Sequence, residues 1–309
     1  MAEEIDVSFV MTVYNKEYYL PSVLTALLAQ SGLKNPEYIF VDDVSSDNSV
    51  EIIRRMTAGL PNVTIVTNPY NRGISARINQ GIALAKGKWT RMLDSDDIFP
   101  LDSTATMIRL AEQNKAEMVY GCFTKTGKEP RDLENCLLEE FDYHCYPNAL
   151  DAVLSGRFTR MGQLIKTDVL QKAGGADERA FIQDESIPLR AAIYAQGIIK
   201  MTSNVVLVPK ELGNFSGNKL QLDHDRFMAY YWTLKDHPEL PADALRKMYL
   251  RAVSAYWKFT KKTKQFPFLS KAFFHYLACK LFHLPPDDSW LQQMYREFAA
   301  RTDMRRIKP

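Results

Sequence analysis

Acidic side chains follow directly after apolar runs at two places in the first hundred residues of this 309-residue chain. Asp42 and Asp43 follow the first of these runs, and residues 94–97 (Asp-Ser-Asp-Asp) follow the second. If the runs are neighbouring strands, the carboxylates meet and repel one another unless a cation neutralises them. Carboxylate oxygens suit Mg²⁺ or Mn²⁺, with substrate phosphates and water completing the coordination. The residue types therefore predict a divalent-metal site for a phosphate-bearing substrate, although Asp and Ser also favour plain turns and helix caps.

The elements that would position these groups alternate between strands and helices over the first 120 residues. Apolar runs of strand length and stretches of helical periodicity follow one another along the chain. The runs fall at 7–13, 38–41, 63–66, 88–93 and 117–123, and the helical stretches at 21–33, 48–56, 73–86 and 104–114. This alternation is typical of an α/β fold with a mostly parallel central sheet and helices on both faces. Because ligands bind such sheets beyond the carboxyl ends of the strands, residues 12–15 and both acidic groups are expected at one edge.

The rest of the chain predicts a second α/β half and a helical tail. Residues 124–146 lack a clear period and are expected to cross the sheet as an irregular excursion. Helical patterns then fall at 148–154, 168–173 and 184–196, and residues 198–208 are expected to form either a strand pair or one long strand. Beyond residue 223 only helical patterns occur, interrupted by prolines. We expect one α/β domain over residues 1–224 and an all-helical subdomain over 225–309.

The formal net charge of +2 is divided very unevenly along the chain. Residues 1–225 carry −7, and residues 226–309 carry +9 with many interleaved aromatic side chains. This division excludes a uniformly basic nucleic-acid-binding protein, so we expect no nucleic-acid partner. Basic, aromatic, amphipathic helices are typical of segments that lie on an anionic membrane surface. The alternative is a helical subdomain with its aromatic side chains in a core and its lysines in water, and both interpretations stay open.

Cysteine usage and the N-terminal residues bear on the compartment. The four cysteines fit no zinc or redox motif, and extracellular proteins more often pair their cysteines. The acidic start lacks the pattern of a signal peptide, and no apolar run reaches the length of about 18 residues that spans a membrane. We expect a cytoplasmic protein, attached peripherally to the inner face of the cytoplasmic membrane if the tail binds lipid.

Four segments, in order, resemble the motifs of family 2 glycosyltransferases. They are residues 9–17 (FVMTVYNKE), 40–47 (FVDDVSSD), 71–81 (NRGISARINQG) and 93–97 (LDSDD). The resemblance is strong over residues 7–120, moderate over 159–208 and absent beyond about 225. It implies the GT-A fold, a Rossmann-like α/β architecture, with residues 1–120 as the nucleotide-sugar half and 121–224 as the acceptor half of a catalytic domain.

The resemblance also implies roles for individual residues. Asp43 should accept a hydrogen bond from the nucleotide base, which suits uracil, and Arg77 should approach the diphosphate unless it is a surface arginine. Asp96 is the expected ligand of Mn²⁺ or Mg²⁺ in the Asp-x-Asp motif, Asp94 supports the metal or the ribose, and Asp97 is the alternative. The remaining residues expected to border the nucleotide sugar are Thr12, Tyr14, Asn15, Glu17 and Ser95.

One position departs from this pattern in the nucleotide half. Val44 stands where the family commonly has glycine. A β-branched residue does not easily adopt a left-handed turn, so this departure leaves the shape of the loop open but does not affect the chemistry.

A second region, residues 174–190, resembles the acceptor side of the family. The family usually has a Glu-Asp pair here, whereas this chain has Gln183 before Asp184. The resemblance implies that Asp184 is the general base, with Glu185 as the alternative. The simpler interpretation is that Asp184 caps the helix that follows.

The resulting hypothesis is a metal-dependent, inverting glycosyltransferase. It would move a sugar from a nucleoside-diphosphate donor, UDP-linked, to a hydroxyl of a glycan or glycolipid acceptor, in bacterial surface polysaccharide or lipopolysaccharide synthesis. Two alternatives are a sugar-nucleotide-binding scaffold without turnover and a sugar-phosphate nucleotidyltransferase. The latter chemistry usually brings a glycine-rich, basic loop after the first strand, and residues 14–17 contain no glycine.

Overall fold

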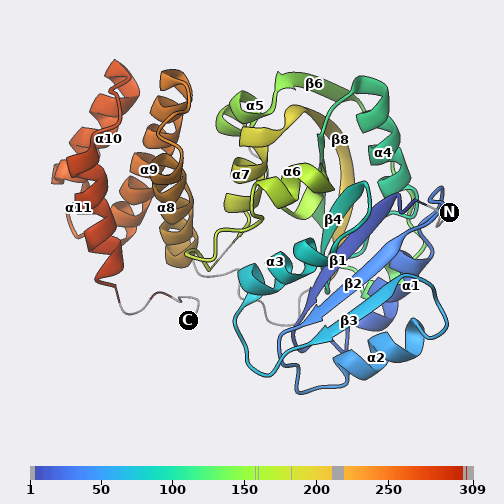
Figure 1. The fold of residues 1–309 in the computed structure, drawn as a ribbon. Coiled ribbons are helices and arrows are strands. Elements are labelled where there is room, and N and C mark those ends of the chain that lie inside the picture. The colour runs from blue at the N-terminus through green and yellow to red at the C-terminus, as the bar shows by residue number, and fades with distance from the viewer. Residues whose placement is uncertain are drawn as a thin grey trace.

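The computed structural model describes residues 4–156, 158, 160–181, 183–210, 219–301 and 304. Its centre is an eight-stranded sheet in the order β3-β2-β1-β4-β7-β5-β8-β6 (Figure 1). The strands are β1 (Val7–Val13), β2 (Glu37–Asp42), β3 (Val63–Thr67), β4 (Trp89–Asp94), β5 (Met118–Lys125), β6 (Tyr143–Asn148), β7 (Gln163–Lys166) and β8 (Gln196–Val208). Neighbouring strands β3, β2, β1 and β4 are all parallel, and β5 runs parallel to β8, whereas β7 and β6 are antiparallel to their neighbours. The predicted α/β fold with a mostly parallel sheet is confirmed.

Helices cover both faces of this sheet. They are α1 (Leu20–Leu28), α2 (Ser49–Met56), α3 (Ile74–Leu84), α4 (Ser103–Asn114), α5 (Ala149–Ser155), α6 (Thr167–Lys172) and α7 (Ser186–Tyr194), with short 3-10 turns η1 (Pro130–Leu133) and η2 (Arg160–Gly162). Side chains alternate along β1, so Phe9 and Met11 join the core under α1, α2 and α4, while Val10 joins the core under α3, α5, α6 and α7. Burial on both faces explains why β1, β2 and β4 could be predicted as continuous apolar runs.

Two strands were not expected from the sequence. β6 lies within the stretch predicted as an excursion, at the edge of the sheet, and most of its residues are exposed. β7 has four residues and is too short to give a recognisable period. Edge exposure and shortness remove the alternating apolar signal on which strand prediction depends.

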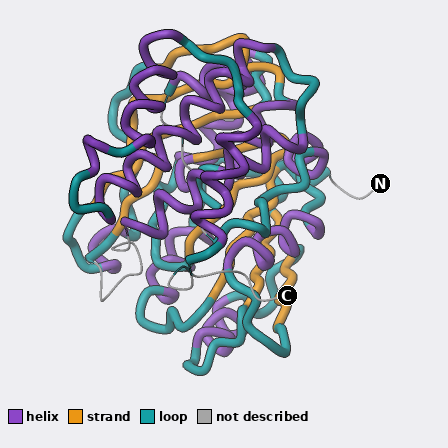
Figure 2. Tube along the Cα trace, turned by 90° about the vertical axis from the view of Figure 1, so that its left-hand side faces the viewer, coloured by secondary structure: helices purple, strands orange, loops and turns teal. Residues whose placement is uncertain are grey.

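The tail consists of helices, which face the viewer in Figure 2. These helices share a hydrophobic core of their own. They are α8 (Lys219–Asp236), α9 (Ala242–Thr263), η4 (Pro267–Leu269), α10 (Lys271–Phe282) and α11 (Asp288–Ala299). Tyr249, Tyr256 and Phe298 are buried in this core, which also takes in Leu189 from α7. The boundary predicted between residues 224 and 225 falls inside α8. Within the described ranges, no helix is both long enough and apolar enough to cross a bilayer.

The turn between β2 and α2 has an unusual backbone at Val44. Its φ is +69°, in the left-handed region that strongly favours glycine and that a β-branched residue opposes. The Asp42 carboxylate holds this turn by accepting hydrogen bonds from the backbone N–H groups of Val44 (3.0 Å) and Ser45 (3.1 Å). Val44 thus adopts a conformation that its branched side chain opposes, and these two hydrogen bonds help to hold it there.

We predict that Val44→Gly stabilises the protein. Glycine removes the cost of roughly 1–2 kcal/mol that a residue with a Cβ atom pays for a left-handed backbone. Part of this gain is lost again, because glycine loses more conformational entropy on folding. The net gain in the free energy of unfolding is expected to be about 1 kcal/mol, since the exposed Val44 side chain buries little apolar surface. Urea denaturation measures this change, and Val44→Ala, which keeps the Cβ atom, should recover only a small part of it. A lower free energy of unfolding for Val44→Gly would show that the turn is not strained.

Candidate nucleotide-sugar site

Three adjacent parallel strands end together at one edge of the sheet. Thr12 of β1 pairs with Val41 of β2 on one side and with Asp94 of β4 on the other, and Val13 pairs with Asp42. Adjacent strands lie only about 4.8 Å apart. The predicted convergence of the polar strand ends is therefore confirmed.

The acidic segment after β4 alternates between inward and outward side chains. Ser95 and Asp97 are buried, whereas Asp94 and Asp96 are partly exposed at the edge of the sheet. A backbone hydrogen bond from Asp97 N to Asp94 O (3.3 Å) closes the turn between them. This alternation makes Asp94 and Asp96 the accessible carboxylates, and places Asp97 beneath them.

Lys16, in the loop between β1 and α1, forms an ion pair with the Asp96 carboxylate. Its ammonium group also lies 5.4 Å from the centroid of the Tyr19 ring. The sequence analysis did not assign Lys16, although it lies inside one of the motifs, because its partner is 80 residues away. The pair shows that Asp96 attracts a cation in this fold.

The oxygen ligands at this edge suit a divalent ion whose coordination is completed by the substrate. Mg²⁺ or Mn²⁺ typically binds one or two protein carboxylates when phosphates and waters supply the other ligands, and Asp94 and Asp96 are two accessible carboxylates. Within the described ranges, no group of three or more His, Cys, Asp or Glu side chains is placed to hold a metal by itself. Asp94 and Asp96 are therefore the residues that could hold a metal together with a diphosphate, and this metal site stays a prediction.

A buried arginine supports this edge from below. Arg91 of β4 is fully buried, and it donates hydrogen bonds to Ser103 Oγ (2.8 Å) and to the Val205 carbonyl (2.8 Å). Its guanidinium lies 4.8 Å from the centroid of the Phe99 ring. Burial lowers the pKa of Arg91 to about 9, since desolvation disfavours the charged form. These contacts fix the end of β4 to the start of α4 and to β8.

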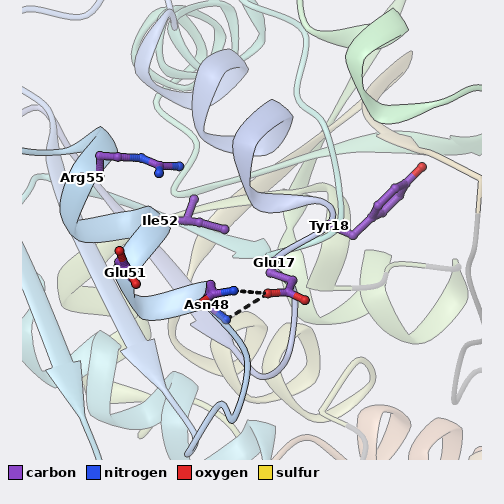
Figure 3. Close-up of a pocket in the computed structure, with 6 residues that line it drawn as sticks. All are labelled: Glu17, Tyr18, Asn48, Glu51, Ile52 and Arg55. Carbon is purple, nitrogen blue, oxygen red and sulfur yellow. Dashed lines mark hydrogen bonds between the residues drawn. The ribbon is translucent and has the colours of Figure 1, made fainter.

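Asn15 and Glu17, both predicted to border the nucleotide, join two loops at the sheet edge. Asn15 Oδ1 accepts a hydrogen bond from Ser46 N (2.8 Å), and Glu17 Oε2 accepts two from Asn48, from N (3.0 Å) and Nδ2 (2.9 Å) (Figure 3). In return, Asp47 accepts a hydrogen bond from Glu17 N (3.0 Å). The loops after β1 and β2 are therefore held as one unit, which explains physically why these two motifs occur together.

Glu17 lines a hollow of about 410 Å³ on the α2 side of this unit. The other lining residues are Tyr18, Asn48, Glu51, Ile52 and Arg55 (Figure 3). Thr12, Asp43, Asp94 and Asp96 are not among them, so this hollow is separate from the strand-end site. Tyr14, in contrast, leaves nearly half of its surface exposed beside the strand ends.

Asp43 is buried and forms an ion pair with Arg77 of α3, with 2.6 Å between Oδ1 and Nε. Its Oδ1 also accepts a hydrogen bond from Arg72 N (2.9 Å), and its Oδ2 accepts one from Gly73 N (2.8 Å). Arg77 is buried rather than a surface arginine, and it also donates to the Tyr70 carbonyl. Arg77 is thus placed to fix Asp43, and its contact with the diphosphate stays a prediction.

The loop that carries Asp184 is attached to the same helix, α3. Asn79 donates to the Ala176 carbonyl (3.0 Å), and its Oδ1 accepts from Ala176 N (2.7 Å). Ser75 donates to the Ala180 carbonyl (3.1 Å). One face of α3 therefore holds the loop, while its first turn holds Asp43.

Asp184 and Glu185 lie in different surroundings. Glu185 is the N-cap residue of α7, and its Oε1 accepts hydrogen bonds from Arg226 of α8, at 2.8 Å from Nε and 2.5 Å from Nη2. Beside it, burial raises the pKa of Tyr230, and the Glu185 carboxylate adds to that rise. Asp184 is partly exposed at the end of the loop. Glu185 is thus committed to an ion pair with the tail, and the role of Asp184 as the base stays a prediction.

The tail contacts the Asp184 loop through a second ion pair. Arg179 pairs with Asp177 within the loop (2.8 Å) and with Asp236 at the end of α8. The sequence analysis missed Arg226 and Arg179 because their partners in the other segment lie 41 and 57 residues away. No local pattern signals such contacts.

Solved structures share this architecture over nearly the whole chain. Staphylococcus aureus TarS, residues 1–349, in complex with UDP-GlcNAc, superposes with a TM-score of 0.65 at 14% identity, covering 95% of this chain and 92% of that one. The mannosyltransferase PcManGT from Pyrobaculum calidifontis, in complex with GDP-Man and Mn²⁺, superposes with a TM-score of 0.56 at 16% identity, covering 97% and 87%. At such identities the likeness establishes the fold, which is GT-A as expected.

Sequence relatives match about a third to a half of the chain. An uncharacterized glycosyltransferase of Haemophilus influenzae is 36% identical over 115 residues, 37% of this chain and 46% of that protein. The Escherichia coli glucosyltransferase WfgD, named for action on α-D-GlcNAc-diphosphoundecaprenol, is 29% identical over 162 residues, 50% of this chain and 63% of that protein. The matches thus span less than two thirds of these relatives.

The family model described as glycosyl transferase family 2 matches residues 8–172, more than half of the chain. The match includes the strand ends, the Asp94–Asp97 segment and α3, and it ends before the loop that carries Asp184. The chain belongs to glycosyl transferase family 2.

Proposed function

We propose that this protein transfers a sugar, with inversion, from a UDP-linked donor to a hydroxyl of a glycan or lipid-linked glycan. The transfer would depend on a divalent metal. The observation that carries the proposal is the arrangement around α3 and the sheet edge. Asp43 follows β2 and the Asp94/Asp96 pair lies at the end of β4, on either side of the end of β1. The Asp184 loop is bound to the helix that fixes Asp43.

The donor half of the proposal rests on Asp43. Its Oδ1 accepts two hydrogen bonds from described residues and its Oδ2 accepts one, which leaves acceptor capacity on Oδ2 for an N–H of a base. Uracil presents such an N–H, and the TarS structure holds UDP-GlcNAc. Thr12 and Tyr14 would border the base and ribose, with Ser95 beneath the diphosphate.

Asp96 and Asp94 would hold Mn²⁺ or Mg²⁺ together with the diphosphate oxygens. When bound, the ion stabilises the charge that develops on the departing nucleoside diphosphate. Lys16, at the same edge, would place a second positive charge near that leaving group. The protein itself would contribute by positioning the donor so that one face of the anomeric carbon stays open to the acceptor.

Asp184 would accept the proton of the acceptor hydroxyl as the oxygen attacks the anomeric carbon from that open face. The oxygen–carbon bond forms while the bond to the diphosphate breaks, so an α-linked donor gives a β-linked product. Glu185, held by Arg226, would keep the end of the loop in place.

We place the acceptor among bacterial surface glycans, on the cytoplasmic side of the membrane. WfgD is named for a diphosphoundecaprenol-linked sugar, and another relative, GgaB of Bacillus subtilis, for minor teichoic acid biosynthesis. All four cysteines lie in the described part of the chain and none is in a disulfide, which agrees with a reducing compartment.

We predict that Asp96→Ala removes the metal dependence of nucleotide binding. In the unchanged protein, Mn²⁺ should strengthen UDP binding at least ~10-fold, because the ion joins the carboxylate to the diphosphate. Isothermal titration of UDP with and without Mn²⁺ measures this difference. Glu51→Ala, at an exposed carboxylate of α2, is the matched control and should keep the Mn²⁺ effect. An intact Mn²⁺ effect in Asp96→Ala would contradict the metal assignment.

We predict that Asp184→Asn lowers sugar transfer by about 10²–10⁴-fold, the typical contribution of a general base. UDP affinity should stay unchanged, because the donor does not need this carboxylate. Release of UDP from a panel of UDP-sugars with Mn²⁺ measures the rate. Glu185→Gln, which weakens the pair with Arg226, should cost much less. The assignment fails if Glu185→Gln is the inactive variant and Asp184→Asn retains turnover.

A further inference from the structure

Exposed apolar side chains are concentrated in one short segment of the tail. Within the described ranges, the large hydrophobic residues with high exposure in the α/β part are scattered over many loops and helices. Seven others lie between residues 266 and 282, and we call them the apolar face: Phe266, Phe268, Leu269, Phe274, Leu277, Leu281 and Phe282. Leu269 and Phe282 are 78% and 72% exposed, far more than isolated surface contacts require.

A surface helix usually turns its apolar side chains toward the protein core, but several large apolar side chains of helix α10 are exposed. Phe274, Leu277 and Leu281 recur at helical spacing and are exposed, whereas His275 points into the subdomain. There His275 Nε2 lies 2.7 Å from the Tyr249 hydroxyl, and its ring stacks on Trp290 at 4.1 Å. Burial lowers the pKa of His275, in keeping with a neutral, inward ring. Only Ala272 and Cys279 of this helix are buried, so its apolar side is left for a surface outside the molecule.

The apolar face is held in shape by the tail core. Trp257 of α9, which is buried, lies against Phe268 (5.5 Å between ring centroids) and Phe273 (5.0 Å). The Ser270 hydroxyl accepts a hydrogen bond from Phe273 N (3.2 Å) and caps the start of α10. The face is therefore a preformed surface of η4 and α10.

Positive charge surrounds this face. Residues 244–286 contain nine Lys and Arg residues and no Asp or Glu. Lys261, Lys264, Lys271 and Lys280 are exposed at or beside the apolar face. Lysine stems can lie along apolar surface while the ammonium groups reach an anionic layer. A mixture of apolar and basic side chains without any acidic residue is complementary to the surface of a bilayer that contains anionic lipid.

We propose that the apolar face of η4 and α10 docks on the surface of an anionic lipid bilayer. Phe274, Leu277, Leu281 and Phe282 enter the boundary between headgroups and acyl chains, and the lysines pair with lipid phosphates. The face lies at the outer side of the helical tail, with α8 and α9 between it and the sheet (Figure 1). The core aromatics Tyr249, Tyr256 and Phe259 take no part, because they are buried.

Docking has a structural connection to the Asp184 loop. The tail helices share one core, and α8 holds the loop through Arg226–Glu185 and Arg179–Asp236. A bilayer bound at α10 would therefore hold the loop at a fixed distance from the lipid surface. This consequence rests on the proposed function, whereas lipid binding itself does not.

Flotation of the full chain with vesicles tests the proposal without any activity assay. Vesicles of phosphatidylcholine alone are compared with vesicles that also contain phosphatidylglycerol, at low and high salt. We expect flotation with the anionic vesicles, weakened by salt. Phe274→Ser/Leu281→Ser/Phe282→Ser should weaken binding at least ~100-fold, since each side chain loses its transfer into the interface. Lys271→Gln/Lys280→Gln should weaken it roughly 25-fold, at about fivefold per lysine.

Controls separate docking from loss of folding and from self-association. Leu60→Ser/Leu137→Ser removes two exposed leucines of the α/β part and should float like the unchanged protein. Thermal unfolding of every variant should stay unchanged, because the substituted side chains are exposed. Unchanged flotation of the triple variant, or no flotation of the unchanged protein, would overturn the proposal. A concentration-dependent dimer that the triple variant loses, without lipid binding, would assign the face to a second copy of the chain instead.

Discussion

The buried ion pair between Asp43 and Arg77 is the contact on which the site depends. Asp43 ends its strand among backbone N–H groups of residues 72 and 73, and Arg77 reaches it from the first turns of α3. A buried carboxylate without its partner is costly, by roughly 3–5 kcal/mol when one member of such a pair is removed. The pair therefore fixes α3 against the sheet edge. Because α3 also binds the Asp184 loop through Ser75 and Asn79, the donor edge and the acceptor loop are positioned by one helix.

Much of this arrangement could be predicted from local patterns. The runs that became β1, β2 and β4 are buried on both faces, so their positions and the Asp groups after them could be read directly. Parallel order then places those groups at one edge without further information. The exchange of hydrogen bonds between Asn15, Glu17 and the loop after β2 was not foreseen. Both residues were assigned to the nucleotide by resemblance, while the structure shows them joining the two loops.

What could not be predicted depends on contacts between distant segments. Lys16 meets Asp96 across 80 residues, and Arg226 meets Glu185 across 41. Neither ion pair produces a local sequence pattern from which it could be predicted. The aromatic residues of the tail show the same difficulty. Tyr249 and Phe259 are buried in the core, whereas Phe274 and Phe282 are exposed. Composition alone could not distinguish these two groups. The packed-subdomain interpretation therefore holds for the buried side chains, whereas the lipid-facing interpretation is our proposal for the exposed ones.

The most direct test of the central claim is a crystal structure with UDP and Mn²⁺, in which anomalous scattering locates the metal. The account predicts a single strong Mn²⁺ peak beside the Asp96 carboxylate, with the diphosphate on the ion, the uracil N–H directed at Asp43 and Lys16 moved off Asp96. A nucleotide bound in the hollow beside Glu51 and Arg55, or a metal held away from Asp94 and Asp96, would contradict it.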